Sequence, residues 1–301
     1  MNVFITGGTG FIGKFLIYRL IKENAHITVA TRQKFKHSSH IDYVNWNKLT
    51  DDEKLDTISK SDVIINLAGE NIASRRWSDK QKAKIIRSRT KITSSLVEII
   101  NRLPQNDKRV FISASAVGYY GDKKDEIINE ASTIGNGFLA EVCELWEKEA
   151  LKVRNCRLVI PRIGVVLHPS GGALKKMLLP YKYYLGGILG SGKQYVPWVH
   201  IDELVNMFLF VAKNKSCEGV YNFVAPNPCT MKEFALSIGN ILRKPVLFKI
   251  PEFLLNVIFG ESATIITNSQ RVIPQRLIDA RFEFEFERIE PALNDLLKHN
   301  E

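Results

Sequence analysis

Short apolar runs alternate with longer amphipathic segments along the first half of this chain. Continuous apolar runs are typical of strands that are buried on both faces of a parallel sheet. The segments between them repeat apolar side chains at helical spacing. Strands that alternate with helices predict an α/β fold, a doubly wound parallel sheet with right-handed crossovers. The predicted strands are residues 3–6, 27–30, 63–67, 110–113 and 157–160, and the predicted helices are residues 11–24, 78–102 and 140–153.

The regular alternation ends near residue 165. We therefore expect a doubly wound domain over residues 1–165 and a smaller, mostly helical lobe over residues 166–301, which returns one or two strands to the main sheet. Phenylalanine and glutamate alternate over residues 282–286, which predicts that the phenylalanines belong to the core. In this lobe we expect glycine-rich loops at 171–172 and 186–192, helices at 201–213 and 231–242, a strand at 220–224, and mostly short helices from 245 onward.

Composition narrows the class of partner. The 301 residues are 45% hydrophobic and 25% charged, as in ordinary globular proteins. The net charge is +10, but no run of five like charges occurs, so nucleic acid is not an expected partner. The four cysteines have no C-x-x-C spacing, so we expect reduced thiols and no metal site. The apolar N-terminus is interpreted as a strand and not as a signal peptide, and no membrane partner is expected. These observations favour a cytoplasmic protein.

The first predicted strand leads into the glycine-rich sequence GGTGFIG at positions 7–13. Between a strand and a helix, glycines of this spacing allow a tight turn, a close approach of the backbone to a pyrophosphate, and close helix packing. The N–H groups at the start of the helix favour the same anion. The sequence therefore predicts a Rossmann-type dinucleotide site, with Gly7, Thr9, Gly10, Phe11, Ile12 and Gly13 in contact with the cofactor.

The residues after the second predicted strand select the cofactor. No acidic side chain occurs between Asn24 and Ile41, where an NAD site places one against the ribose 2′-hydroxyl. Thr31 and Arg32 stand there instead, with Lys34 beyond them, and an arginine can hold a 2′-phosphate through two hydrogen bonds. We therefore expect NADP. The alternative is that Arg32 is an ordinary solvent-exposed loop residue.

Several further motifs resemble those of the extended short-chain dehydrogenase/reductases. They include Leu67-Ala68-Gly69-Glu70-Asn71, Ser113 to Gly121, and Pro197-Trp198-Val199-His200. Within this superfamily the chain is most similar to a divergent subgroup of NAD(P)-dependent epimerase family proteins, some of them labelled cell-division-inhibitor-like. The stretch Gln270-Arg271-Val272-Ile273-Pro274 is similar to the extra C-terminal domain of that subgroup. The resemblance covers the whole chain.

The resemblance implies roles for particular residues. Ser115 matches the catalytic serine or threonine, with Ser113 and Ala114 beside the nicotinamide. Leu67 and Ala68 match the strand end below the adenosine and ribose. The implied cofactor contacts are completed by Lys84, Arg89 and Arg162.

The chain departs from active relatives at the Tyr-x-x-x-Lys pair. The matching positions hold Leu139 and Cys143, and neither side chain can replace a phenol and an ammonium. Tyr119 and Tyr120 follow Ser115 closely and are the candidate phenols, although packing within a loop is the alternative interpretation of both. The candidate catalytic residues are therefore Ser115, Tyr119 and Tyr120.

Two functions of different classes follow. The first is an NADP(H)-binding, epimerase/dehydratase-like oxidoreductase acting on a carbonyl or nucleotide-sugar-like substrate. The second is a catalytically silent NADP(H)-binding regulator or sensor. The loop at residues 186–192, followed by Lys193 and Gln194, could surround an anionic group of a small-molecule substrate with backbone N–H donors, or could be a simple flexible loop. The sequence leaves a homodimer open.

Overall fold

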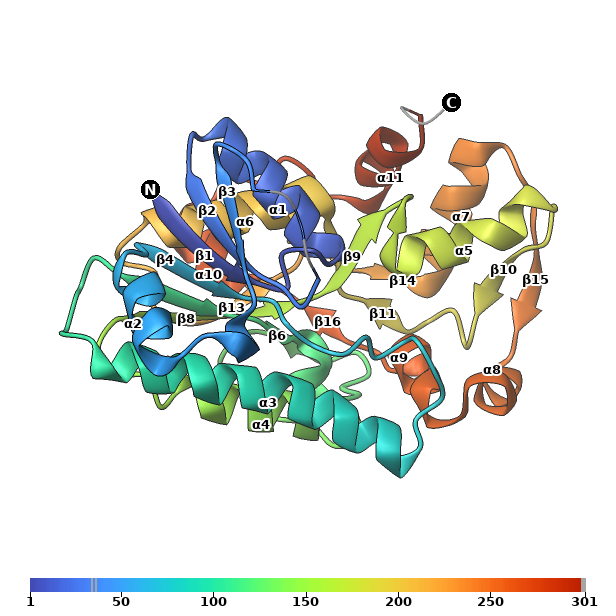
Figure 1. Cartoon of the computed structure of the whole chain (residues 1–301). Coiled ribbons are helices and arrows are strands. Elements are labelled where there is room, and N and C mark those ends of the chain that lie inside the picture. The colour runs from blue at the N-terminus through green and yellow to red at the C-terminus, as the bar shows by residue number, and fades with distance from the viewer. Residues whose placement is uncertain (34, 36, 299–301) are drawn as a thin grey trace.

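A parallel sheet with the strand order β13-β8-β5-β4-β1-β2-β3 forms the centre of the computed structural model (Figure 1). The structure describes residues 1–33, 35 and 37–298, so Lys34 lies outside the described residues. A short strand, β6 (Ser115–Ala116), also pairs with β8. The seven strands of the order given above are β1 (Asn2–Thr6), β2 (His26–Ala30), β3 (Ile41–Val44), β4 (Val63–Asn66), β5 (Val110–Ser113), β8 (Arg157–Ile163) and β13 (Gly219–Phe223).

The position of β1 confirms the predicted doubly wound sheet. β1 lies between β2 and β4, and its last residue, Thr6, pairs with Ala30 on one side and Asn66 on the other. The carboxyl ends of these three strands therefore meet at one edge. β13 comes from the second half of the chain and pairs in parallel with β8.

Helices cover both faces of the sheet, because side chains of β1 alternate between two apolar cores. Val3 and Ile5 pack in the core that contains Leu16 and Leu20 of α1 (Phe11–Lys22). Phe4 packs on the opposite face, in the core with residues of α3 (Asp79–Arg102). α6 (Ile201–Lys213) joins α1 on the first face, and α4 (Phe138–Ala150) lies beside α3 on the second. Sequence analysis did not predict β3, nor α2 (Asp51–Ser59).

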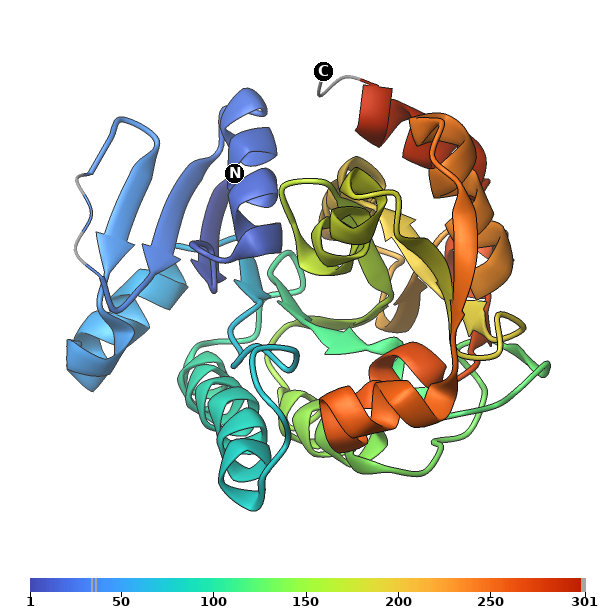
Figure 2. The same cartoon turned by 90° about the vertical axis from the view of Figure 1, so that its right-hand side faces the viewer.

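Beside the sheet, the second half of the chain adds further helices and short strand pairs (Figures 1 and 2). The expected loop at 186–192 is wrong in its first part, because Gly186–Leu189 forms β10, which pairs with β15 (Val246–Ile250). No helix among the described residues is long and apolar enough to cross a membrane. The helices are α5 (Gly172–Lys182), α7 (Met231–Leu242), α8 (Glu252–Phe259), α9 (Thr264–Thr267), α10 (Gln275–Asp279) and α11 (Ile289–Lys298), and the other pairs are β9 (Val165–His168) with β12 (Trp198–His200), β11 (Tyr195–Val196) with β14 (Cys229–Thr230), and β7 (Ile127–Ile128) with β16 (Arg271–Val272).

Phe282 and Phe286 are buried in the main core, as the alternating pattern predicted, although residues 282–286 form no strand. A two-residue period sorts side chains into buried and exposed sets in any extended segment, so the pattern alone does not require pairing.

Candidate functional site

The glycine loop turns between β1 and α1 at the carboxyl edge of the sheet. Gly7 has a φ of 72°, and a Cβ atom there would lie 2.7 Å from the carbonyl carbon of Leu67. A Cβ atom on Gly13 would lie 2.5 Å from the Gly7 oxygen. Both contacts are with backbone atoms, which have no freedom to move aside. The loop therefore requires glycine at both positions.

The N-terminus of α1 faces this loop without a side-chain cap. Gly10 is the cap residue, and no side chain among the described residues caps the first turn through a hydrogen bond. The N–H groups of a first turn have no partner within their own helix, and the helix dipole places partial positive charge there. Both properties fit an anionic group such as a pyrophosphate. Thr9 lines the same space, whereas the ring of Phe11 packs against the backbone of Gly171.

A groove of about 910 Å³ follows the carboxyl ends of β1, β2 and β4. Thr31 and Arg32 line it at the end of β2, and Leu67 and Ala68 at the end of β4. α3 adds three basic side chains along one stripe, Lys84, Arg87 and Lys91. Sequence analysis missed Arg87 and Lys91, although Arg87 follows Lys84 by three residues and Lys91 follows Arg87 by four, a spacing that places all three on one helix face.

Glu70 is the acidic side chain that lines this basic groove. Its carboxylate accepts a 2.7 Å hydrogen bond from Lys84 Nζ. That bond lowers the pKa of Glu70, and the charge of Arg32 acts in the same direction. Glu70 is therefore negatively charged at neutral pH and holds Lys84 at the groove wall.

Arg89, an implied cofactor contact, does not line the groove. Its guanidinium donates to the Glu70 carbonyl oxygen at 3.0 Å, and its central carbon lies 5.1 Å from the centre of the Trp146 ring. The planar group lies below Gly69, where a Cβ atom would be 3.0 Å from it. Arg89 supports the backbone that forms the groove floor.

Ser113 and Ala114 are buried at the end of β5. The Asn66 amide donates to the Thr93 hydroxyl at 2.8 Å and to the Ser113 hydroxyl at 3.3 Å. These contacts join β4, β5 and α3 through a polar network inside the core. Each of these side chains is hydrogen-bonded to another, so the cost of burying its polar group is offset. Ser113 therefore fixes the strand that leads to Ser115.

Ser115 belongs to a buried ionic network. Its hydroxyl donates a 2.5 Å hydrogen bond to Glu147 Oε1. The two oxygens of Glu147 accept from Arg162 Nε at 2.9 Å and from Arg162 Nη2 at 2.8 Å. Burial opposes the charge of Arg162, but the hydrogen bonds and charge of Glu147 outweigh it and raise the pKa of Arg162. Glu147, which sequence analysis missed, connects two residues that it had selected separately.

The two candidate phenols differ in their surroundings. The Tyr120 ring is fully buried, its hydroxyl donates to Asn222 Oδ1 at 2.7 Å, and it accepts from Arg162 Nη1 at 3.0 Å. Burial raises the pKa of Tyr120 to about 12, although the charge of Arg162 acts in the opposite direction. Tyr119 is half-buried, and the central carbon of the Arg162 guanidinium lies 3.4 Å from the centre of its ring.

The turn that carries both tyrosines, η2 (Val117–Tyr120), is held by the C-terminal part of the chain. The Gln270 amide donates to the carbonyl oxygens of Val117 at 2.9 Å and Gly121 at 2.8 Å. β16 pairs with β7 directly beside it. Residues almost 150 positions later in the sequence therefore fix the backbone around Tyr119.

Leu139 and Cys143 lie directly against this turn. A Cβ atom on Gly118 would be 3.1 Å from Leu139 Cβ and 3.7 Å from Cys143 Sγ. The thiol of Cys143 is 3.5 Å from the Ala116 carbonyl oxygen, and burial raises its pKa to about 11. At neutral pH the thiol is therefore uncharged. α4 carries these residues to the side of Ser115, but neither provides a phenol or a cation.

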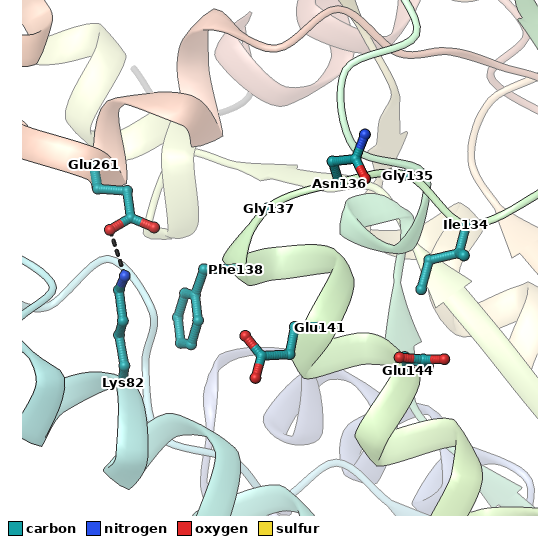
Figure 3. Close-up of a pocket in the computed structure, with 9 residues that line it drawn as sticks. All are labelled: Lys82, Ile134, Gly135, Asn136, Gly137, Phe138, Glu141, Glu144 and Glu261. Carbon is teal, nitrogen blue, oxygen red and sulfur yellow. Dashed lines mark ion pairs between the residues drawn. The ribbon is translucent and has the colours of Figure 1, made fainter.

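A second hollow, of about 470 Å³, lies between the N-termini of α3 and α4 and the turn η3 (Gly260–Ala263) (Figure 3). Lys82 of α3 reaches across it to the Glu261 carboxylate at 2.5 Å. Its ammonium also lies 5.1 Å from the centre of the Phe138 ring. Nearby, Arg76 Nη2 donates to the Val257 carbonyl oxygen at 2.9 Å. These two contacts join the doubly wound domain to the C-terminal region.

Two protein-family models match parts of the chain. The "NAD dependent epimerase/dehydratase family" matches residues 3–139, and the "Domain of unknown function (DUF1731)" matches residues 250–296. An epimerase family protein of Arabidopsis thaliana, an SDR39U1 homolog described as chloroplastic, is 39% identical over 99% of this chain and 87% of its own length.

The chain belongs to the NAD dependent epimerase/dehydratase family. An epimerase family protein of Staphylococcus saprophyticus is 38% identical over 97% of this chain and 98% of its own length. The crystal structure of human epimerase family protein SDR39U1 with NADPH has a TM-score of 0.86 and 31% identity, and the match covers 98% of this chain and 99% of that chain. The resemblance inferred from the motifs is thereby confirmed, including the extra C-terminal domain.

Proposed function

We propose that this family member is an NADP(H)-binding oxidoreductase of the epimerase/dehydratase type, which acts on a small carbonyl or nucleotide-sugar-like molecule. The substrate would lie between the domain at residues 1–165 and the lobe at residues 166–301. One observation carries the proposal: the groove at the sheet edge has Arg32 where an NAD site places an acid. The human relative crystallised with NADPH supports the same cofactor.

The residues of the groove fit the parts of a dinucleotide. The uncapped N-terminus of α1 suits the pyrophosphate, and the backbone of Gly7 and Gly10 leaves room for it. Leu67 and Ala68 offer backbone and apolar contact to the ribose and adenine side. Arg32 suits the 2′-phosphate, with Lys84, Arg87 and Lys91 adding positive charge along the wall. When bound, the cofactor would supply hydride chemistry.

Ser115 and Tyr119 are the residues best arranged to handle a proton. Ser115 directs its own proton to Glu147, so its lone pairs can accept a hydrogen bond from a substrate hydroxyl. The Tyr119 ring is partly exposed, and among the described residues its hydroxyl has no hydrogen-bond partner. Tyr120 is engaged by Asn222 and Arg162, so its proposed role is to position Arg162 beneath Tyr119.

The test is a screen of carbonyl compounds and nucleotide sugars at saturating NADP(H), with Tyr119→Phe, Tyr120→Phe and Ser115→Ala in parallel. Loss of general acid–base help lowers rates by about 10²–10⁴-fold. We expect Tyr119→Phe to lower kcat by that amount and to leave NADPH affinity unchanged. Brisk turnover that is insensitive to Tyr119→Phe and Ser115→Ala would show that the proton moves elsewhere.

The second candidate function is a catalytically silent NADP(H)-binding sensor. It is favoured by Leu139 and Cys143, which lie against the turn after Ser115 and which the resemblance matches to the Tyr-x-x-x-Lys pair of active relatives. Intact NADPH binding in calorimetry with no turnover in the same screen would select the sensor. Failure to bind NADPH would contradict both functions.

A further inference from the structure

α8 presents an apolar surface to solvent. Phe253 and Val257 are 68% and 67% exposed, and Leu254 and Ile258 are exposed beside them. Residues four apart lie on the same side of a helix, so the two pairs form adjacent rows. Leu255 is the buried residue of this helix. Such a helix exposes most of the apolar area that a helix in a globular protein normally buries.

This surface continues onto neighbouring elements. Tyr183 and Leu185, at the end of α5, are 69% and 55% exposed, and Leu247 of β15 is 71% exposed. Lys244 Nζ lies 3.4 Å from the centre of the Tyr184 ring, which joins the end of α5 to the start of β15. Figure 2 shows the end of α5, β15 and α8 on one side of the molecule. We call this side the apolar face. Apolar residues exposed singly are normal on a protein surface, whereas these are grouped on adjoining elements.

Basic side chains accompany the apolar face. Residues 172–196 contain four lysines and no aspartate or glutamate. Residues 243–259 contain Arg243, Lys244 and Lys249 against one acid, Glu252. Lys182, Arg243 and Lys249 are exposed. A second copy of the chain would place this positive charge against itself, which disfavours a symmetric dimer through this face.

We propose that the apolar face binds the surface of a lipid bilayer that contains anionic headgroups. Exposed phenylalanine, leucine and tyrosine side chains surrounded by lysine and arginine match a membrane interface, where apolar groups enter the acyl boundary and cations meet lipid phosphates. Sequence analysis expected no membrane partner, and no described helix could span a bilayer, but binding to a membrane surface requires no spanning helix. The groove at the sheet edge is formed by other elements, so the protein could hold its cofactor while bound to lipid.

The test is sedimentation of the full chain with vesicles of phosphatidylcholine alone, and with vesicles of equal parts phosphatidylcholine and phosphatidylglycerol. We expect binding to the anionic vesicles only, and weaker binding at high salt because exposed charges are screened. The double variant Phe253→Asn, Val257→Asn should abolish sedimentation. Lys182→Gln and Lys249→Gln should each weaken it about five-fold, which corresponds to ~1 kcal/mol per basic residue near the surface.

Two matched variants far from this face serve as controls. Leu151 is 62% exposed at the end of α4, and Lys108 is exposed just before β5. Leu151→Asn and Lys108→Gln should leave vesicle binding unchanged. NADPH binding, measured on every variant, reports that the fold is intact.

Three outcomes would overturn the proposal. The first is no sedimentation with anionic vesicles, or sedimentation that the face variants do not change. The second is a dimer in light scattering that Phe253→Asn, Val257→Asn converts to a monomer, which would assign the face to a second copy. The third is binding of polyglutamate through these residues without binding to vesicles, which would assign it to an acidic protein partner.

Discussion

Arg162 holds the carboxylate of Glu147 through two hydrogen bonds, of 2.9 and 2.8 Å, with both side chains almost fully buried. Two charges removed from water are tolerated only when their geometry is good and their remaining hydrogen-bonding capacity is used. Ser115 and Tyr120 use part of that capacity. The ionic pair therefore positions two of the proposed site residues at once.

Glu147→Gln should strongly destabilise the fold. The change leaves the Arg162 cation buried without a counter-ion, and breaking a buried pair costs about 3–5 kcal/mol. Chemical denaturation measures the loss. Glu144→Gln on the same helix is the matched control, because its pair with Lys148 is exposed and such pairs contribute at most about 1 kcal/mol. An equal loss of unfolding free energy in the two variants would show that the buried pair stabilises the fold no more than the exposed pair.

Gly13→Ala should destabilise the glycine loop. Alanine normally stabilises a helix by up to about 1 kcal/mol relative to glycine. Here the added methyl group would lie 2.5 Å from the Gly7 carbonyl oxygen, and overpacking of this kind costs about 1–3 kcal/mol. We expect a lower melting temperature and weaker NADPH binding. Lys14→Ala, at the exposed neighbouring position, should change stability little. A gain in stability for Gly13→Ala would contradict the crowding argument.

Arg32→Ala should weaken NADPH binding selectively. A hydrogen bond to a charged group contributes about 1.5–3 kcal/mol to binding. NADPH would lose this bond in the variant, whereas NADH has no 2′-phosphate and should bind as before. Calorimetry with both cofactors measures the difference. Arg75→Ala, an exposed arginine outside the groove lining, should leave both affinities unchanged. Equal affinities for NADPH and NADH in the unmutated protein would refute the role of Arg32.

Glu203 should make stability depend on pH. Burial raises the pKa of its carboxyl above the usual value of 4.5. Oε2 accepts the backbone N–H groups of Glu285 and Phe286, whereas Oε1 has no partner among the described residues. The protonated form is therefore favoured by folding. The stabilisation of the fold by this protonated carboxyl is complete below the pKa of the unfolded state, and it is lost as the pH rises through the pKa of the folded state.

Glu203→Gln should remove this dependence. As the pH rises above about 4.5, the free energy of unfolding of the wild type should fall relative to that of the variant. Urea denaturation at a series of pH values measures the difference. Glu283→Gln is the control, because Glu283 is an exposed carboxylate close in sequence to Glu285 and Phe286. Parallel curves for wild type and Glu203→Gln would contradict the assignment.

The central sheet was predictable because its strands are short, continuous apolar runs. β3 was missed since each of its four residues is only partly buried, so its apolar pattern is weak. α2 had a visible signal that was not used: Thr50 and Glu53 form a capping box at its start. The pair β10–β15 joins segments about 60 residues apart, and local periodicity contains no information on such pairing.

The candidate site was only partly accessible from sequence. The glycine spacing and the strand order are enough to place Gly7, Arg32 and Leu67 at one edge. Glu147 is different, because its role depends on Arg162, which approaches α4 from strand β8. A signal did exist in the helix pattern: Glu147 lies on the apolar stripe with Cys143 and Ala150, where a charge requires a buried partner.

The hydrogen bonds from Gln270 to the turn that carries Tyr119 have a consequence for synthesis on the ribosome. Residues 1–165 emerge first and can assemble most of their sheet while translation continues at about 5–20 residues per second. The support of the turn arrives only when nearly the whole chain has been made. A nascent chain released before Ser269 would carry the glycine loop without a fixed Tyr119, so the protein completes its proposed reaction centre last.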